Sequence, residues 1–198
     1  MKKILFFLLA AIFCFSLTAC GETPAPEKAA DGTPWGEDWV TISNVMGVDT
    51  PEGLTLQDNK DALAASGMYY STWSIGEESS YMDKTEEGEK EVTIYDAQVF
   101  LLLSGSSSVE ETEKNREEWL AMADEHYQID SKETGTWNGQ EFTLISYRLT
   151  DSPYARGASA FGIYGNYAVI AEFSCQESFK GDPREYLDTF LKHCHYGA

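Results

Sequence analysis

Residues 139–175, GQEFTLISYRLTDSPYARGASAFGIYGNYAVIAEFSC, decide the fold, because they read as three consecutive β-strands. The last of these, Tyr167–Phe173, is apolar on both faces. A strand with one face in water alternates apolar and polar residues, whereas a near-continuous apolar run indicates cover on both sides. We therefore place this strand at the centre of a sheet, with helices packed above and below it.

Two hairpins surround the central strand. Asn138-Gly139 is a strong signal for a two-residue turn and joins predicted strands at 128–137 and 141–149. Gly165-Asn166 joins a strand at 158–164 to the central strand in the same way. The pattern predicts an antiparallel meander.

Two helices have clear start signals. Ser108, with Glu111 three residues later, forms a capping box, and apolar residues recur at helical spacing from there to Tyr127. Asp182 followed by Pro183 places a capping side chain and a preformed first turn before a second helix at the C-terminal end.

The first half of the predicted domain is assigned from composition. Trp39–Ser43 and Met68–Ile75 are rich in β-branched and aromatic residues and predict strands, whereas Gln57–Ser66, stopped by Gly67, predicts a short helix. Glu91–Leu103 predicts one long strand that pairs with Met68–Ile75 as a hairpin. Together these elements predict an α+β fold, a mainly antiparallel sheet flanked by helices on both faces.

This order of elements resembles the PsbP-like (Mog/PsbP) α/β/α sandwich. The residues that carry the resemblance are 136–142 (TWNGQEF), the meander through Phe173 and the helix 186–191 (YLDTFL). The resemblance implies a single domain over residues 39–198. It also implies a non-catalytic docking or binding module, because known members act in photosystem assembly or bind a small GTPase. No partner-binding residue of those members maps onto this chain.

The N-terminal residues resemble a bacterial lipoprotein leader. Lys2 and Lys3 precede an apolar run, which ends in Leu17-Thr18-Ala19-Cys20. The resemblance to a lipobox implies a signal peptide at 1–19, cleavage before Cys20, and a diacylglycerol on its sulfur. Two acyl chains anchor a protein stably to a membrane. The alternative is an ordinary secretory signal with an incidental cysteine.

The remainder of the N-terminal region, residues 20–38, holds three prolines and three glycines and has no apolar period. This composition predicts a flexible linker between the lipid anchor and the domain. The expected location is therefore the extracytoplasmic face of a bacterial cell-envelope membrane.

Charge excludes one class of partner. The chain has 14 basic and 33 acidic side chains, a formal net charge of -19, and removal of Lys2 and Lys3 with the leader makes it -21. Nucleic-acid binding needs clustered Lys and Arg, and this sequence has no such cluster. The acidity makes the surface soluble and repels anionic partners without naming a partner.

Cysteine and histidine suggest a disulfide more readily than a metal. Cys175 and Cys194 either form a disulfide, which export permits, or remain two buried free thiols. His193 and His195 flank Cys194, but structural zinc needs a second ligand pair from another segment, and we expect no metal or other cofactor. The acidic run 77–91 lacks the spacing of an EF-hand loop, so we interpret it as a charged hairpin tip rather than a calcium site.

Two further segments contain residue types that often serve a function. Ser159 lies in a Gly157-to-Phe161 segment similar to a nucleophile elbow, but Phe161 stands where that motif needs glycine, and we expect no catalytic serine. Tyr154 and Arg156 lie in a loop where we expect an exposed tyrosine beside a cation. Tyr and Arg are common interface anchors, so this loop is the candidate binding surface.

Three function classes remain open at this stage. The first is a non-catalytic binding or scaffold module, held to the membrane through Cys20, with an unknown protein or small-molecule partner. The second is a carrier for a small apolar ligand, which needs an enclosed cavity. The third is a hydrolase, which needs converging polar groups with shifted pKa values. We favour the first, because no catalytic set is apparent.

Overall fold

The computed structural model describes residues 28–30, 32–42, 45–63, 67–85, 88–150 and 152–197, and for residues 59–63, 84 and 85 it describes the backbone alone. The predicted signal peptide and Cys20 lie outside the described residues. Neither helix of the described ranges has the length and apolar character needed to cross a bilayer.

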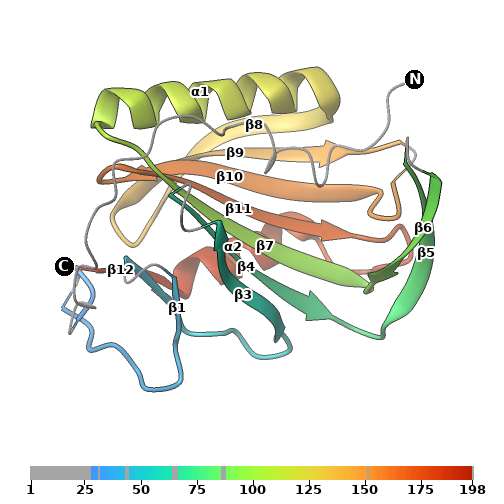
Figure 1. Cartoon of the computed structure of the whole chain (residues 1–198), viewed down its shortest axis with the longest axis horizontal. Coiled ribbons are helices and arrows are strands. Elements are labelled where there is room, and N and C mark those ends of the chain that lie inside the picture. Colours follow the sequence, from blue (N-terminus) through green and yellow to red (C-terminus); the bar gives the residue numbers. More distant parts are fainter. Residues whose placement is uncertain are drawn as a thin grey trace.

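A seven-stranded antiparallel sheet forms the body of the protein, in the order β3-β4-β7-β11-β10-β9-β8 (Figure 1). Its strands are β3 (Thr55–Leu63), β4 (Met68–Ile75), β7 (Ala97–Gly105), β8 (Gln128–Trp137), β9 (Gln140–Arg148), β10 (Arg156–Tyr164) and β11 (Tyr167–Cys175).

Two smaller antiparallel sheets and two helices complete the described fold. One small sheet has the order β1-β2-β12, and the other pairs β5 with β6. The remaining elements are β1 (Val40–Ile42), β2 (Met46–Val48), β5 (Ser79–Thr85), β6 (Gly88–Ile94), α1 (Val109–His126), α2 (Pro183–Lys192) and β12 (Cys194–Tyr196).

The central position predicted for the two-faced apolar strand is confirmed. β11 is the middle strand of the seven and pairs with β7 on one side and β10 on the other. Val169, Ala171 and Phe173 belong to the apolar cluster that includes α2 residues, whereas Ala168 and Ile170 belong to the cluster that includes α1 residues. Alternate side chains of β11 therefore support the cores on both faces of the sheet.

The predicted sandwich with helices on both faces is wrong. The described chain is mostly antiparallel strand, with twelve strands and two helices, and no layer of helices covers a face. Seven strands spaced by about 4.8 Å make a sheet much wider than one helix of about 10 Å diameter. Among the strands of the main sheet, each helix makes its most extensive contacts with β10 and β11. On the α2 side, the sheet β1-β2-β12 adds Ile42, Met46 and Val48 to the core.

The start signals of both helices and the Asn-Gly turn are confirmed. The Ser108 hydroxyl accepts a hydrogen bond from the Glu111 amide at 3.2 Å, and the Asp182 carboxylate accepts one from the Arg184 amide at 2.9 Å. Asn138 and Gly139 both have positive φ, at 48° and 78°, as the two central residues of a type I′ hairpin turn require.

Two predictions for the first half of the domain are wrong. Gln57 lies in strand β3, not in a helix, because this segment pairs with β4 along the edge of the sheet. Pairing of this kind overrides a weak helical propensity. The single long strand predicted from Glu91 to Leu103 is two strands, β6 and β7, interrupted at Tyr95 and Asp96.

Part of the predicted linker packs on the domain. Ala29 forms an isolated β-bridge with Gly197 and is buried, and the Ala30 amide donates to the Tyr196 carbonyl at 2.7 Å. Lys28 bridges to Pro34 within the same segment. These contacts join the segment of residues 28–30 and 32–38 to the C-terminal end of the domain.

A matched pair of leucines tests the core on the α2 side. Leu187 of α2 has 0% of its surface exposed, whereas Leu56 of β3 has 40% exposed. Replacing Leu187 with alanine removes buried apolar atoms and leaves a cavity, so we expect the free energy of unfolding to fall by about 2–5 kcal/mol. Leu56→Ala should change it by about 0.5 kcal/mol or less. Urea unfolding of both variants measures the difference, and equal losses would contradict the described packing.

Candidate functional site

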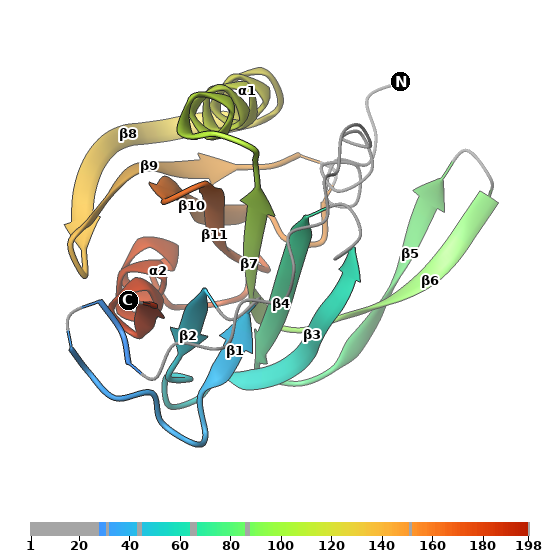
Figure 2. The same ribbon diagram turned by 60° about the vertical axis from the view of Figure 1, so that its left-hand side comes forward.

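The sheet of β5 and β6, called the arm below, stands clear of the main sheet (Figure 2). Among the described strands, β5 and β6 pair only with each other, from Ser79 opposite Ile94 to Thr85 opposite Gly88. The arm continues the hairpin of β4 and β7, whose last described pair is Ile75 opposite Ala97. It therefore presents two strand edges that no described strand covers.

The arm is acidic and carries one large exposed apolar side chain. Asp83 lies opposite Lys90, and Met82 lies opposite Glu91. Half of the Met82 surface is exposed. Residues 77–94 contain seven acidic and two basic residues in the sequence. Charged side chains along strand edges discourage pairing between copies of a protein.

Hydrogen bonds hold the base of the arm at the break between β6 and β7. The Gln176 amide donates to the Asp96 carbonyl at 2.9 Å, and the Gln176 side chain donates to the Tyr95 carbonyl at 2.9 Å. The Tyr95 amide donates to the Tyr154 hydroxyl at 3.1 Å. The opposite strand turns at Gly76, where φ is 84° and a Cβ would collide with the Asp96 side chain. Specific contacts therefore fix the interruption of the predicted long strand at Tyr95 and Asp96, which is called the joint below.

The joint extends to the edge strand through Gln57. The Tyr95 hydroxyl donates to Gln57 Oε1 at 3.0 Å, and Gln57 Nε2 donates to the Ser74 hydroxyl at 2.8 Å. Tyr95 and Gln57 were not singled out from the sequence. Their side chains are common polar and aromatic types, and only the strand register brings them together.

The structure places Tyr154 and Arg156 at this joint rather than on an exposed surface. Tyr154 has only 5% of its surface exposed, so the expectation of an exposed tyrosine is wrong. Arg156 is half-buried, and its guanidinium donates to the Phe179 carbonyl. The loop turns inward because the Tyr154 hydroxyl meets the Tyr95 amide. Tyr154 therefore supports the base of the arm, whereas Arg156 holds the Phe179 carbonyl.

A second candidate site contains a buried carboxylate, which lies between α1 and the main sheet. Glu172 of β11 has 7% of its surface exposed. Its Oε2 accepts hydrogen bonds from the Ser159 hydroxyl at 2.8 Å and from the Tyr127 hydroxyl at 3.2 Å. Tyr127 is the C-terminal cap of α1, and its ring stacks on Tyr147 at 4.2 Å. This carboxylate therefore ties the end of α1 to the middle of the sheet.

Burial raises the pKa of Glu172 above its usual value, and the nearby hydroxyls of Ser159, Tyr147 and Tyr127 offset part of that rise. The Tyr147 hydroxyl contributes without forming a hydrogen bond to a described residue. Burial also raises the pKa of Tyr127 and Tyr147, so both hydroxyls remain protonated. A single acid inside an apolar strand was the available sequence signal, and sequence reasoning missed it.

Ser159 has a structural partner in this cluster. It is fully buried, opposite Glu172 in the pairing of β10 with β11, and its hydroxyl donates to the carboxylate. The partner of a nucleophilic serine is a base that removes its proton near an open site. Here the Ser159 hydroxyl and the Glu172 carboxylate are both buried beneath α1, so Ser159 stabilises a buried acid.

The two cysteines of the domain are free and buried, which matches the free-thiol alternative. The Cys194 thiol donates to the Phe190 carbonyl at 3.5 Å. Burial raises the pKa of both Cys175 and Cys194, Cys194 strongly, which keeps the thiols protonated.

The histidines beside Cys194 are engaged in other contacts. His195 stacks on Trp39 with ring centroids 4.4 Å apart, and His193 Nδ1 lies 3.5 Å from an Asp49 carboxylate oxygen. Within the described ranges, no group of three or more His, Cys, Asp or Glu side chains is placed to hold a metal ion.

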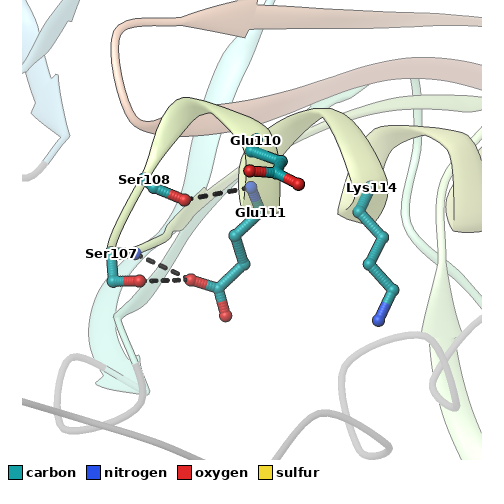
Figure 3. A pocket seen from close by; sticks show the side chains of 5 residues that line it. All are labelled: Ser107, Ser108, Glu110, Glu111 and Lys114. Atoms are coloured by element: carbon teal, nitrogen blue, oxygen red, sulfur yellow. Dashed lines mark hydrogen bonds between the residues drawn. The ribbon is translucent and has the colours of Figure 1, made fainter.

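A solvent-open depression lies at the start of α1 (Figure 3). Ser107, Ser108, Glu110, Glu111 and Lys114 line it. The Glu111 carboxylate accepts hydrogen bonds from the Ser107 amide at 2.9 Å and the Ser107 hydroxyl at 2.7 Å, which lower its pKa. The polar groups of the depression thus cap the helix, and no second feature marks a ligand site.

No family model and no curated protein matches this chain. The solution structure of cyanobacterial PsbP (CyanoP) from Synechocystis sp. PCC 6803 is similar to it, with 11% identity, a TM-score of 0.38, and coverage of 75% of this chain and 95% of that chain. The chain therefore has a PsbP structure among its neighbours, as the sequence resemblance suggested. The TM-score is too low to support a conclusion about function.

The buried acid predicts an unusual pH dependence. Because the pKa of Glu172 is raised in the folded state, its contribution to stability is present at pH values below its unfolded pKa, near 4.5, and is lost as pH rises through the folded pKa. Glu172→Gln removes this titration. We expect the stability of the wild type relative to the variant to fall as the pH rises above about 4.5, measured by urea unfolding.

Glu111→Gln is the matched control, because the pKa of Glu111 is lowered and its contribution has the opposite sign. The stability of the wild type relative to this control should fall as pH decreases through the Glu111 pKa. A constant difference between the wild type and Glu172→Gln across the whole range would contradict the buried position of Glu172.

The thiol state is tested by alkylation without a reducing agent. Unfolded in denaturant, the peptides that contain Cys175 and Cys194 should each take up one alkyl group, measured by mass after proteolysis. In the folded state both should react slowly, because burial disfavours the thiolate. If neither cysteine reacts in denaturant until a reductant is added, the two are joined in a disulfide.

Proposed function

We propose that this protein is a non-catalytic docking module of the bacterial cell envelope, anchored through a lipid on Cys20, that presents the arm to a partner. The observation that carries the proposal is the position of the arm. It projects at one end of the domain, and the described N-terminal segment lies at the opposite end in both views (Figures 1 and 2). A membrane anchor on the N-terminal side would leave the arm free to meet a partner.

The chemistry of the arm defines the kind of partner that fits. The parts of the arm along Ser79–Asp83 and Lys90–Ile94, which pair with no other described strand, can accept an extended segment through main-chain hydrogen bonds. With seven acidic and two basic residues in 77–94, the arm favours a segment of neutral or positive charge and repels an anionic one. The same charges oppose pairing between two arms, so the edges stay available.

The packing of the domain favours docking over the carrier alternative. A carrier needs an enclosed apolar space between sheet and helix. On the α2 side, Trp73, Phe173 and Phe190 fill that space with side chains that have 0% of their surface exposed. The rings of Trp73 and Phe190 meet edge to face at 5.0 Å.

The buried polar cluster disfavours the hydrolase alternative. Glu172 combines burial with a raised pKa, which is a common property of catalytic acids. Its carboxylate, however, is enclosed by Ser159, Tyr127 and Tyr147 and forms the contact between α1 and the sheet. A substrate would have to displace the helix end to reach it.

Site-specific photocrosslinking in intact cells tests the proposal. A crosslinking amino acid at Met82 on the arm is compared with one at Val109 on α1, because each side chain has 50% of its surface exposed. We expect one discrete crosslinked protein from position 82 and none from position 109. Equal yields from the two positions, or a product from 109 alone, would contradict docking through the arm.

The anchoring part of the proposal has a separate test. Cys20→Ala removes the sulfur that would carry the diacylglycerol and should move the protein from the membrane fraction to the soluble extracytoplasmic fraction. Cys194→Ala, which alters a buried thiol of the domain, should leave the protein in the membrane fraction. Retention of the Cys20 variant in the membrane would contradict lipid anchoring.

A further inference from the structure

The described chain starts beside two tryptophans. Lys28, the first described residue, forms a β-bridge with Pro34. Trp35 is the next residue after Pro34. The bridge of Ala29 to Gly197 fixes the same segment to the end of the domain. The point from which the chain runs back toward Cys20 therefore lies next to Trp35.

Trp35, Trp39 and His195 form one connected aromatic surface, called the aromatic surface below. The Trp35 and Trp39 rings lie 6.5 Å apart, and Trp39 stacks on His195 at 4.4 Å. The Trp39 ring packs closely on β2 at Gly47, where a Cβ would meet the ring at 2.8 Å. Both tryptophans are half-buried, unlike Trp73, Trp119 and Trp137, which belong to the core.

Covalent geometry limits how far this surface can be from the lipid. Cys20 precedes Lys28 by eight residues in the sequence. A fully extended chain spans at most about 3.5 Å per residue, so the lipidated sulfur and Lys28 can be separated by roughly 28 Å at most. This is comparable to the hydrocarbon thickness of one bilayer, about 30 Å. A lipid anchor would therefore keep the aromatic surface close to the membrane.

We propose that the aromatic surface lies against the bilayer, with Trp35 and Trp39 at the level of the lipid headgroups. The inference rests on the proposed anchoring through Cys20. Tryptophan is enriched in this region of a bilayer. Glu37 and Asp38, both exposed between the two tryptophans, stay in the headgroup layer and limit the depth of contact.

The charge of the chain indicates which lipids fit. With a formal net charge of -21 once Lys2 and Lys3 are removed with the leader, the protein is repelled by an anionic surface, so the contact depends on the aromatic rings rather than on charge attraction. Zwitterionic phosphatidylcholine vesicles are the appropriate probe. This contact would fix the orientation of the domain and direct the arm away from the membrane.

Quenching of tryptophan fluorescence tests the inference with the full-length lipidated protein. The protein is reconstituted into phosphatidylcholine vesicles that carry a nitroxide quencher near the headgroup, and vesicle flotation is measured in parallel. We expect quenching in the wild type and loss of most of it in the double variant Trp35→Phe, Trp39→Phe. Trp119→Phe, which alters a ring beneath α1 with 3% exposure, should retain the quenching.

The two readouts separate failure of the inference from failure of the anchoring. If the protein floats with the vesicles but the double variant is quenched as strongly as the wild type, the aromatic surface does not face the lipid and the inference is overturned. If the protein does not float, the proposed anchoring fails and the inference fails with it. The single variants Trp35→Phe and Trp39→Phe provide the same comparison if the double variant does not fold.

Discussion

The two-sided pairing of β11 is the constraint on which the rest of the structure depends. A strand bonded to neighbours on both edges, and apolar on both faces, has no surface that tolerates water. Val169 and Phe173 require cover from the α2 side, and Ala168 and Ile170 require it from the α1 side. α1 packs against β11 on one side and α2 on the other, although no layer of helices covers either face of the described sheet. The three-stranded sheet covers part of the α2 face that a helix of ten residues cannot reach.

Glu172 is the one acidic residue of this apolar strand, and its neighbours supply the polar contacts that a buried carboxylate needs. An ionised carboxylate in an apolar interior is costly unless hydrogen-bond donors surround it. Ser159 and Tyr127 supply those donors, and Gly157 leaves room for Tyr147, whose hydroxyl a Cβ at residue 157 would meet at 2.4 Å. The polar cluster therefore stabilises the contact of α1 with the sheet.

The strands of the main sheet also separate the two ends of the domain. The N-terminal segment bonds to β12 at one end, and the arm leaves β4 and β7 at the other. An isolated pair of strands has only marginal stability in water. The bonds from Tyr154, Gln176 and Gln57 at its base therefore give the arm a defined direction.

Sequence patterns predicted the elements whose signals are local. The Asn138-Gly139 turn and the Asp182 cap depend on backbone angles and on hydrogen bonds within a few residues, and both were confirmed. The helix predicted at Gln57 failed because pairing with β4, a contact between segments, outweighed local propensity. The exposure of Tyr154 failed for the same reason, since its partner Tyr95 is distant in the sequence. The joint of the arm could therefore not be predicted from local sequence patterns, because its contacts join segments that are distant in the sequence.

The central claim is that the domain holds its N-terminal segment near the membrane and its arm away from it. Energy transfer from a fluorophore to acceptors in the headgroups of a lipid vesicle measures this directly on the full-length lipidated protein. A fluorophore placed at exposed Glu37 is compared with one at exposed Met82. We expect strong transfer from position 37 and much weaker transfer from position 82. Equal transfer from both positions, or stronger transfer from the arm, would contradict this claim.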